Sequence, residues 1–190
     1  METVAQKAVS DVLAESGHCA CQRCHDDTMA LVLNQLPSRY YRASSDPAVE
    51  ADELEARYLP QARSLADEAA VTVHKAPRHD TDESYQLMNY SVQIVESSFA
   101  DILPLTKACL CAVCVADMVS YALDQLDCKY VCTTRGAAFT QLEELRAEPD
   151  PHRLSVFFQA IAYVNRNRRH KQDVEQNPIA EQNENQSTRH

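Results

Sequence analysis

A run of three cysteines followed by a helix-like segment occurs twice in this chain, and this duplication limits the possible folds more than any other feature. The two runs, ninety residues apart, are Cys19, Cys21, Cys24 and Cys109, Cys111, Cys114. Without a gap, the same offset aligns further identical pairs: Asp27/Asp117, Leu33/Leu123, Gln35/Gln125, Leu36/Leu126 and Tyr40/Tyr130. Unrelated segments do not align in this way, so the chain contains an internal repeat.

The apolar spacing predicts matching helices in the two copies. The first helix of copy one covers residues 2–16, and its counterpart covers about 92–103 and ends near Pro104. After each cysteine run, apolar residues at i, i+3, i+4 and i+7 predict an amphipathic helix of about three turns. These residues are Met29, Val32, Leu33, Leu36 and Val119, Ala122, Leu123, Leu126.

Later segments predict short strands and more helices. Residues 39–42 and 129–132 are β-prone and flanked by helix breakers, so each is expected to form a brief strand. Asp46 followed by Pro47 indicates a helix start, Pro60 is expected to end that helix, and another is expected over 61–75. The corresponding helices of copy two are expected over 140–147 and 151–166. One extra residue there aligns Arg78-His79 with Arg169-His170.

The predicted fold is therefore mainly α, with short β segments and two tandem repeats. We expect repeat 1 over residues 1–79, a linker over 80–86 and repeat 2 over 87–170. Residues 171–190 are rich in Gln, Asn and Glu without apolar periodicity, so a disordered tail is expected there. The chain has only two glycines, which disfavours an alternative built of tight β-hairpins.

Composition excludes several classes of protein. The sequence has no apolar run of about 18 residues, which argues against a membrane span, and it lacks the apolar centre of a signal peptide. We therefore expect a cytoplasmic protein, in which the eight cysteines indicate metal or redox chemistry rather than disulfides. The net charge of −10 argues against binding of long nucleic acid.

The spacing of each cysteine run predicts a structural zinc site. Three thiolates within six residues can face one ion, and zinc takes four ligands. For copy one the fourth ligand could be His18 or His25, and for copy two Cys128 or Cys132. A water or an unplaced residue could also complete either site. Inert packed thiols and an iron–sulfur or redox site are the alternatives, but repetition of all three cysteines favours zinc.

Other polar residues near the runs are expected to have structural roles. For Cys128 and Cys132, which occur in one copy only, packing is the better interpretation. Asp27 and Asp117 are expected to compensate the positive end of the following helix, and His79 and His170 to occupy helix ends rather than bind metal.

These residues resemble the late competence development protein ComFB family. The resemblance rests on the cysteine run with Asp27, the helix end over 30–40 and the segment over 75–79. It covers residues 4–79 well and 90–170 more loosely. Copy two departs from the pattern at Asp127-Cys128-Lys129 and at 167–170. The resemblance implies small zinc-binding helical domains that form symmetric dimers, so the tandem copies are expected to pack as a pseudo-twofold dimer within one chain.

Some members of the family are cyclic dinucleotide receptors, and the resemblance implies the same ligand here. Such a ligand needs cations for its phosphates and flat groups for its bases, which arginine and tyrosine provide. The candidate ligand-binding residues are Arg39, Tyr40, Tyr41 and Arg42, with Lys129 and Tyr130 in copy two. The alternative is that these residues bind no ligand, with the arginine in solvent and the tyrosine packed on a neighbouring helix.

The leading hypothesis is a non-enzymatic cytosolic receptor for cyclic di-GMP or cyclic di-AMP, with structural zinc. The alternative is a zinc-stabilised adaptor between proteins that binds no small ligand, and a thiol-based sensor is a third. The sequence lacks a glycine-rich phosphate loop, a Gly-x-Ser-x-Gly elbow and a His-Glu-x-x-His helix, which argues against an enzyme. The protein partner and any further pairing of two chains stay open.

Overall fold

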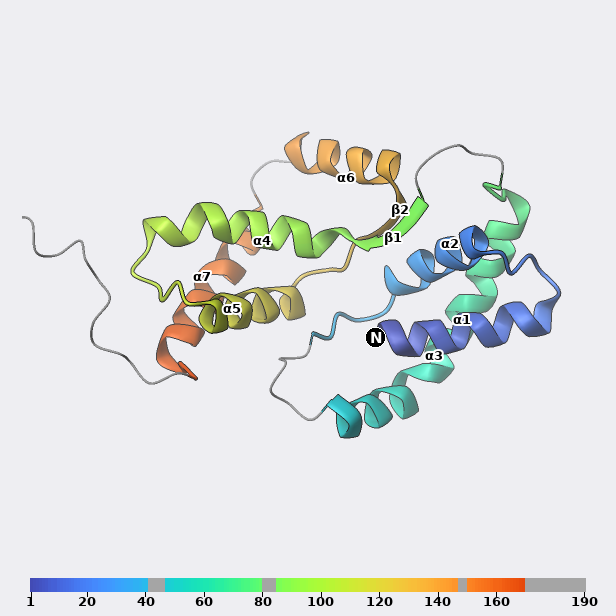
Figure 1. Cartoon of the computed structure of the whole chain (residues 1–190), viewed down its shortest axis with the longest axis horizontal. Coiled ribbons are helices and arrows are strands. Elements are labelled where there is room, and N and C mark those ends of the chain that lie inside the picture. The colour runs from blue at the N-terminus through green and yellow to red at the C-terminus, as the bar shows by residue number, and fades with distance from the viewer. Residues whose placement is uncertain (41–46, 80–84, 147–149, 170–190) are drawn as a thin grey trace, which may run out of the picture.

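The computed structural model describes residues 1–40, 47–79, 85–146 and 150–169, and within them the chain is mainly helical. Figure 1 shows the arrangement of the helices and the single pair of strands. No helix in these ranges is both long and apolar enough to cross a membrane. In chain order the elements are α1 (Glu2–Ser16), α2 (Gln22–Leu33), α3 (Pro47–Lys75), β1 (Tyr85–Asn89), α4 (Tyr90–Ile102), the 3-10 turn η1 (Leu103–Leu105), α5 (Ala112–Gln125), β2 (Tyr130–Thr133), α6 (Thr134–Arg146) and α7 (Pro151–Arg166).

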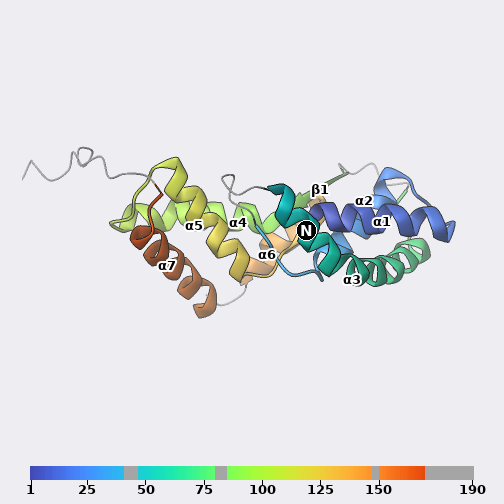
Figure 2. The ribbon, with the colours of Figure 1, turned by 90° about the horizontal axis from the view of Figure 1, so that it is seen from below.

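Each repeat forms its own helical lobe, as the duplication predicts. The lobe of repeat 1 consists of α1, α2 and α3, and the lobe of repeat 2 consists of α4, α5 and α7 (Figures 1 and 2). Each lobe has a separate apolar core, which the helices line with the residues expected from their periodicity. Val12 and Leu33 are buried in the first core, and Phe99 packs on Phe157 in the second with ring centroids 5.1 Å apart.

The first helix of each repeat ends differently. Gly17 caps α1 in the left-handed conformation, with φ of 68°, and it is the only described residue with positive φ. Repeat 2 has Lys107 at the equivalent position, and there α4 runs into η1 with Pro104 in its first turn. Glycine tolerates the left-handed cap because it has no side chain, whereas repeat 2 needs another way to stop the helix.

The predicted helix break at Pro60 is wrong, because α3 continues from Pro47 to Lys75. The helix bends along its length (Figure 1), and a proline inside a helix is a common cause of a kink. Proline in a helix interior costs about 3 kcal/mol or more, and burial of apolar side chains on both sides offsets this cost. They include Tyr58, Ala62, Ala66 and Ala69. In repeat 2 the aligned proline, Pro151, instead begins a separate helix.

The strands follow the prediction in repeat 2 only. β2 covers most of the segment expected there, whereas Arg39 and Tyr40 form no strand, and positions 41 and 42 lie outside the described residues. The partner strand was not predicted: β1 begins at Tyr85, within the segment assigned to the linker. The two strands pair antiparallel, and both contact α2 of repeat 1. The sheet therefore joins the two lobes.

Equivalent residues of the two repeats bond to each other in a reciprocal way. The side chain of Asn34 accepts from the backbone N–H of Tyr130 (2.6 Å) and donates to its carbonyl (3.1 Å). Its counterpart Asp124 accepts from the backbone N–H of Tyr40 (2.7 Å), and Tyr40 is the counterpart of Tyr130. An exchange of this kind is the mark of a two-fold interface. The expected pseudo-twofold dimer within one chain is confirmed.

The pseudo-twofold axis passes close to Ser38 and Cys128. These two residues are equivalent by the ninety-residue offset, and the Ser38 Oγ and Cys128 Sγ atoms are 3.0 Å apart. Only residues near a two-fold axis can contact their own equivalents. The Asn89 side chain donates to the hydroxyls of both Tyr40 (2.6 Å) and Tyr130 (3.0 Å), which ties the two equivalent tyrosines together.

We predict that Asn34→Ala destabilises the protein, because it leaves the N–H and carbonyl of Tyr130 without their partner. The expected loss is about 1–3 kcal/mol in the free energy of unfolding, measured by urea denaturation. Gln35→Ala is the matched control, since the Gln35 side chain donates to the Leu31 carbonyl in the last turn of α2 and not to the other repeat. Equal midpoints for the two variants would show that the Asn34 bonds do not hold the repeats together.

Candidate metal centres

The first cysteine run forms a four-ligand cluster with a residue from the far end of its repeat. The Sγ atoms of Cys19, Cys21 and Cys24 and one ring nitrogen of His79 all lie within 4.8 Å of one another. The Nε2 atom of His79 is 2.8 Å from the Sγ atom of Cys24. In a regular tetrahedral zinc site, Zn–S bonds of about 2.3 Å place sulfurs about 3.8 Å apart. The donor set and its spacing therefore fit zinc.

The fourth donor of this cluster comes from outside the cysteine run, and not from either histidine that flanks it. His18 and His25 flank the run, but neither belongs to the cluster. The His18 ring packs on the His74 ring, with centroids 4.4 Å apart, and the Nε2 atom of His25 lies 3.0 Å from the Gln6 side chain. His79 was expected only to occupy a helix end. The alignment of Arg78-His79 with Arg169-His170 in the other copy is the one feature of the sequence that could have indicated His79 as a ligand.

Local helix structure places the three sulfurs. Cys21 is the N-cap of α2 and Cys111 is the N-cap of α5, with nearly the same backbone angles (φ −64°, ψ 158° and φ −67°, ψ 150°). The first N–H groups of a helix have no partner within it and attract negative charge. The Cys111 side chain accepts from the N–H of Cys114 (3.4 Å). The start of each helix thus favours thiolates at this position.

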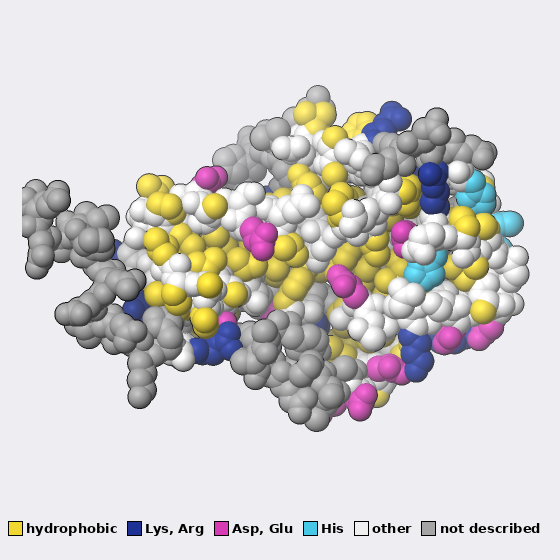
Figure 3. Space-filling model, in the orientation of Figure 1, with side chains coloured by type: hydrophobic (Ala, Val, Ile, Leu, Met, Phe, Trp, Pro, Cys, Tyr) yellow, Lys and Arg dark blue, Asp and Glu magenta, His cyan; other side chains and the backbone are white. Residues whose placement is uncertain are grey.

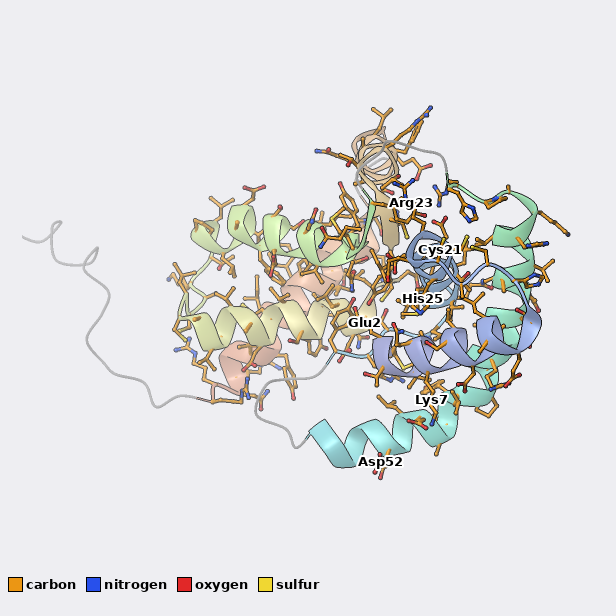
Figure 4. The ribbon with its side chains drawn as sticks, turned by 45° about the vertical axis from the view of Figure 1, so that its right-hand side comes forward. Glu2, Lys7, Cys21, Arg23, His25 and Asp52 are labelled. Carbon is orange, nitrogen blue, oxygen red and sulfur yellow. The ribbon has the colours of Figure 1, made fainter. Side chains whose placement is uncertain are left out.

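An ion pair between a buried aspartate and an exposed arginine holds the segment of His79 beside the sulfurs. Arg78 donates from Nε to Asp27 (3.2 Å) and from a second nitrogen to the other carboxylate oxygen. Asp27 lies three residues after Cys24 and is buried. Arg23, in the first turn of α2, also donates to the carbonyl of His79 (3.0 Å); Figure 4 shows Arg23 near Cys21 at this helix start. The end of the repeat is therefore fastened beside the cysteines.

Repeat 2 preserves the same arrangement. The sulfurs of Cys109, Cys111 and Cys114 lie within 4.8 Å of one another. Arg169 donates from Nε to Asp117 (2.8 Å) and from a second nitrogen to the other oxygen, and Asp117 is buried. The aligned His170 lies outside the described residues.

The helix-end role expected for the two aspartates is wrong. Neither Asp27 nor Asp117 is in the first turn of its helix, and each forms a paired contact with an arginine. A planar guanidinium matches a carboxylate with two parallel hydrogen bonds, which fixes orientation as well as distance. The aspartates are therefore anchors for the end of each repeat.

The thiols of each cluster cannot all ionise without a cation. Burial, together with hydrogen bonds to the neighbouring thiols, raises the pKa of Cys24 to about 12 and that of Cys114 to about 12. The backbone N–H of Cys24 lowers the pKa of the Cys21 thiol. Metal ions bind thiolates and release their protons. A bound cation would therefore favour the thiolate form of the buried cysteine in each cluster.

The remaining cysteines lie apart from both clusters. Burial raises the pKa of Cys132 to about 12, and its thiol donates to the carbonyl of Asp26 (3.2 Å). Cys128 is half-buried at the pseudo-twofold axis. Among the described residues, neither belongs to a group of metal-ligating side chains. Both positions agree with packing.

The residues expected to bind a nucleotide lie in two hollows beside the junction of the repeats. The Arg39 hollow, of about 360 Å³, is lined by both repeats and includes Tyr40 and Tyr130. The Lys129 hollow, of about 320 Å³, also contains His152 and Arg153 from α7, which the sequence did not indicate. Tyr41 and Arg42 lie outside the described residues.

Both tyrosine hydroxyls are engaged within the protein. Tyr130 donates to the Glu2 carboxylate (2.7 Å), and Tyr40 lies 3.3 Å from the Cys128 sulfur. Figure 4 shows Glu2 at the side of repeat 1 that faces repeat 2. Arg39 is exposed, and its side chain donates to the carbonyl of the neighbouring Ser38 (3.1 Å). A ligand in this hollow would meet the arginine and the tyrosine rings rather than their hydroxyls.

The late competence development protein ComFB family model matches the chain twice, over residues 1–77 and 88–168. The two matched segments correspond to the two lobes. No curated protein and no solved structure matches the chain.

We predict that His79→Ala weakens zinc binding at the first cluster by at least about tenfold, because one of four ligands is lost. Competition with a chromophoric chelator measures this affinity. His74→Ala is the control, since His74 lines the same cavity but contributes no ligand atom to the cluster. If zinc affinity fell in His74→Ala and not in His79→Ala, His79 would not be the zinc ligand.

We also predict that Arg78→Gln weakens zinc binding by about 10–100-fold, as for other residues that orient a ligand. The variant keeps all four ligands and removes the contact that positions His79. The same chelator competition measures the change, and Arg57→Gln, an exposed arginine on α3, is the control. Unchanged affinity would show that His79 reaches the sulfurs without the ion pair.

Proposed function

The chain belongs to the late competence development protein ComFB family, and we propose that it is a non-enzymatic cytosolic regulator that holds two structural zinc ions and binds a cyclic dinucleotide beside the junction of its repeats. The family is a competence-related regulatory one. Zinc binding and nucleotide binding can be tested separately, because zinc would stabilise each repeat and the nucleotide would bind beside the junction of the repeats.

Zinc as the resident ion is supported by the donors of the first cluster. Three sulfurs and one imidazole nitrogen are the four donors that a closed tetrahedral site needs. Such a donor set is typical of structural zinc and would leave no position for a reacting water. In repeat 2 the three sulfurs form the same cluster beside the same kind of ion pair. When bound, zinc would neutralise the thiolates and fasten the end of the repeat to the start of its second helix.

The observation that carries the ligand proposal is a pair of related hollows, one beside Arg39 and one beside Lys129. The Arg39 hollow and the Lys129 hollow share aligned positions on their walls: Met1/Ser91, Pro37/Asp127 and Arg39/Lys129. Each volume falls within the range of about 300–1,000 Å³ usual for ligand pockets. A cyclic dinucleotide is itself two-fold symmetric, so a pseudo-twofold junction with one cation on each side suits its two phosphates.

The chemistry of the hollows supports an anionic, aromatic ligand. An arginine can pair with a phosphate through two hydrogen bonds and can stack on a base. Arg39 is exposed beside the rings of Tyr40 and Tyr130. Lys129 and Arg153 supply cations in the second hollow.

Binding at this place would regulate by stabilising the docked repeats. The Arg39 hollow takes Leu33 and Pro37 from repeat 1 and Cys128 and Tyr130 from repeat 2. A ligand that contacts both repeats favours the arrangement in which they are joined, and it does so by its difference in affinity for the joined and separated states. The surface offered to a protein partner would change with it.

A second candidate function is a zinc-stabilised adaptor without a small ligand. The observation in its favour is the presence of carboxylates in both hollows: Glu2 in the first, and Asp127 and Asp150 in the second. Negatively charged carboxylates repel a phosphate group and so oppose its binding. In that case the hollows would be part of the surface that a protein partner recognises.

We predict that calorimetric titration of the zinc-loaded protein with cyclic di-GMP and cyclic di-AMP gives heat with one of them. A hundredfold excess over Kd adds about 2.7 kcal/mol of stability, which raises Tm by about 5–10 °C. The double variant Arg39→Ala/Lys129→Ala should lose this binding, whereas Arg57→Ala should keep it.

Two results would contradict the receptor. Absence of heat and of a thermal shift with both nucleotides would favour the adaptor. Undiminished binding by the double variant would place the ligand elsewhere. Zinc content is measured first, so that loss of the fold is not mistaken for loss of the ligand site.

A further inference from the structure

The same face of the two repeats has opposite chemistry. This face lies between the first and second helix of each lobe, which are α1 and α2 in repeat 1 and α4 and α5 in repeat 2. At aligned positions, polar residues of repeat 1 are replaced by apolar residues of repeat 2. The pairs are Ser10/Ala100, Glu15/Leu105, Gln22/Ala112, His25/Val115 and Asp26/Ala116.

In repeat 1 this face is a hydrogen-bonded polar surface. Gln22 donates to Asp26 (2.8 Å), Gln6 lies 3.0 Å from the His25 ring, and Gln6 also donates to Ser10 (3.3 Å). Polar side chains that bond to one another along a helix face are typical of a surface in contact with water.

In repeat 2 the same face is an apolar groove. Its volume is about 640 Å³, and its walls include Phe99 and Leu103 on one side and Val115 and Val119 on the other. Figure 3 shows the apolar side chains gathered over α4 and α5, with acidic groups at the edge. Contiguous exposed apolar surface of this kind marks a site of association.

Two exposed leucines lie at one end of the groove: Leu105 is beside it, and Leu110 is part of its lining. Leu105 is 87% exposed and Leu110 is 61% exposed, and both belong to the segment that joins α4 to α5. Burying a leucine side chain is favourable, so exposure of a leucine at the position that aligns with Glu15 is unfavourable in an isolated chain. The surface thus contains a protrusion and a hollow side by side.

We propose that the α4/α5 groove binds a second copy of this chain, in a two-fold dimer in which Leu105 of each copy enters the groove of the other. A two-fold interface pairs one patch with itself, so the patch must contain both the inserting and the receiving surface. The groove with Leu105 and Leu110 meets this condition. An antiparallel arrangement places the leucine end of one copy over the opposite end of the groove in the other.

Charge at the two ends agrees with this arrangement. Lys107 is exposed at the leucine end, and Glu96 is exposed at the opposite end, where it lines the groove. The antiparallel dimer brings Lys107 of each copy towards Glu96 of the other, which gives two complementary contacts. A parallel arrangement would bring like charges together. This interface is separate from the junction between the repeats.

The test is sedimentation velocity on the full zinc-loaded chain, at concentrations up to about 100 µM. The wild-type chain is expected to dimerise. The triple variant Leu105→Glu, Ala112→Gln, Ala116→Asp installs the residues that repeat 1 already carries at these positions, so the fold should tolerate it. It is expected to weaken the dimer at least about tenfold. Leu154→Gln, on an exposed leucine of α7, is the control.

A charge exchange tests the orientation. Lys107→Glu should weaken the dimer, and Lys107→Glu with Glu96→Lys should restore it. A monomeric wild-type chain, or a dimer that the triple variant leaves unchanged, would overturn the proposal. So would a failure of the exchange to restore the dimer, or equal weakening by Leu154→Gln. Circular dichroism and zinc content show that each variant keeps its fold.

Discussion

The contact on which the rest of the structure depends is the fastening of each repeat's end to the start of its second helix. An aspartate three residues after the cysteine run holds an arginine of the last segment, as Asp27 holds Arg78. The ring of the next residue, His79, then contacts the Cys24 sulfur. This fastening closes the long path from the second helix to the end of the repeat. Buried charge needs a partner, so the ion pair also fixes where the metal ligand lies.

Closed lobes can then pack as units, and the junction between them uses equivalent residues in reciprocal roles. Asn34 and Asp124 each hold the backbone of the other repeat's tyrosine, and Ser38 meets its own equivalent Cys128. The two-fold relation explains why the hollows come in a pair. It also explains why a two-fold ligand is the natural candidate, and why an effect of that ligand would reach both lobes.

Duplication within one chain lets the copies diverge while the shared geometry is kept. The cluster and its ion pair are present in both repeats. The outer face has changed from polar at Gln22 and Asp26 to apolar at Ala112 and Ala116. A symmetric dimer of identical chains could not make this change on one side only. The tandem form therefore permits a polar, water-exposed face on repeat 1 and an apolar face on repeat 2 that can bind another chain.

The sequence by itself determined the duplication, the cysteine trios and most of the helices, because local periodicity and a constant offset express them directly. The pseudo-twofold pairing was expected from the resemblance to the family and not from periodicity. Only the tertiary structure decided that His79 completes the first cluster, because that contact joins residues fifty-five positions apart. The same holds for the continuous helix through Pro60, where core burial outweighs a local signal, and for β1, whose strand character depends on pairing with β2. Such features arise from long-range packing, and no local pattern carries the information.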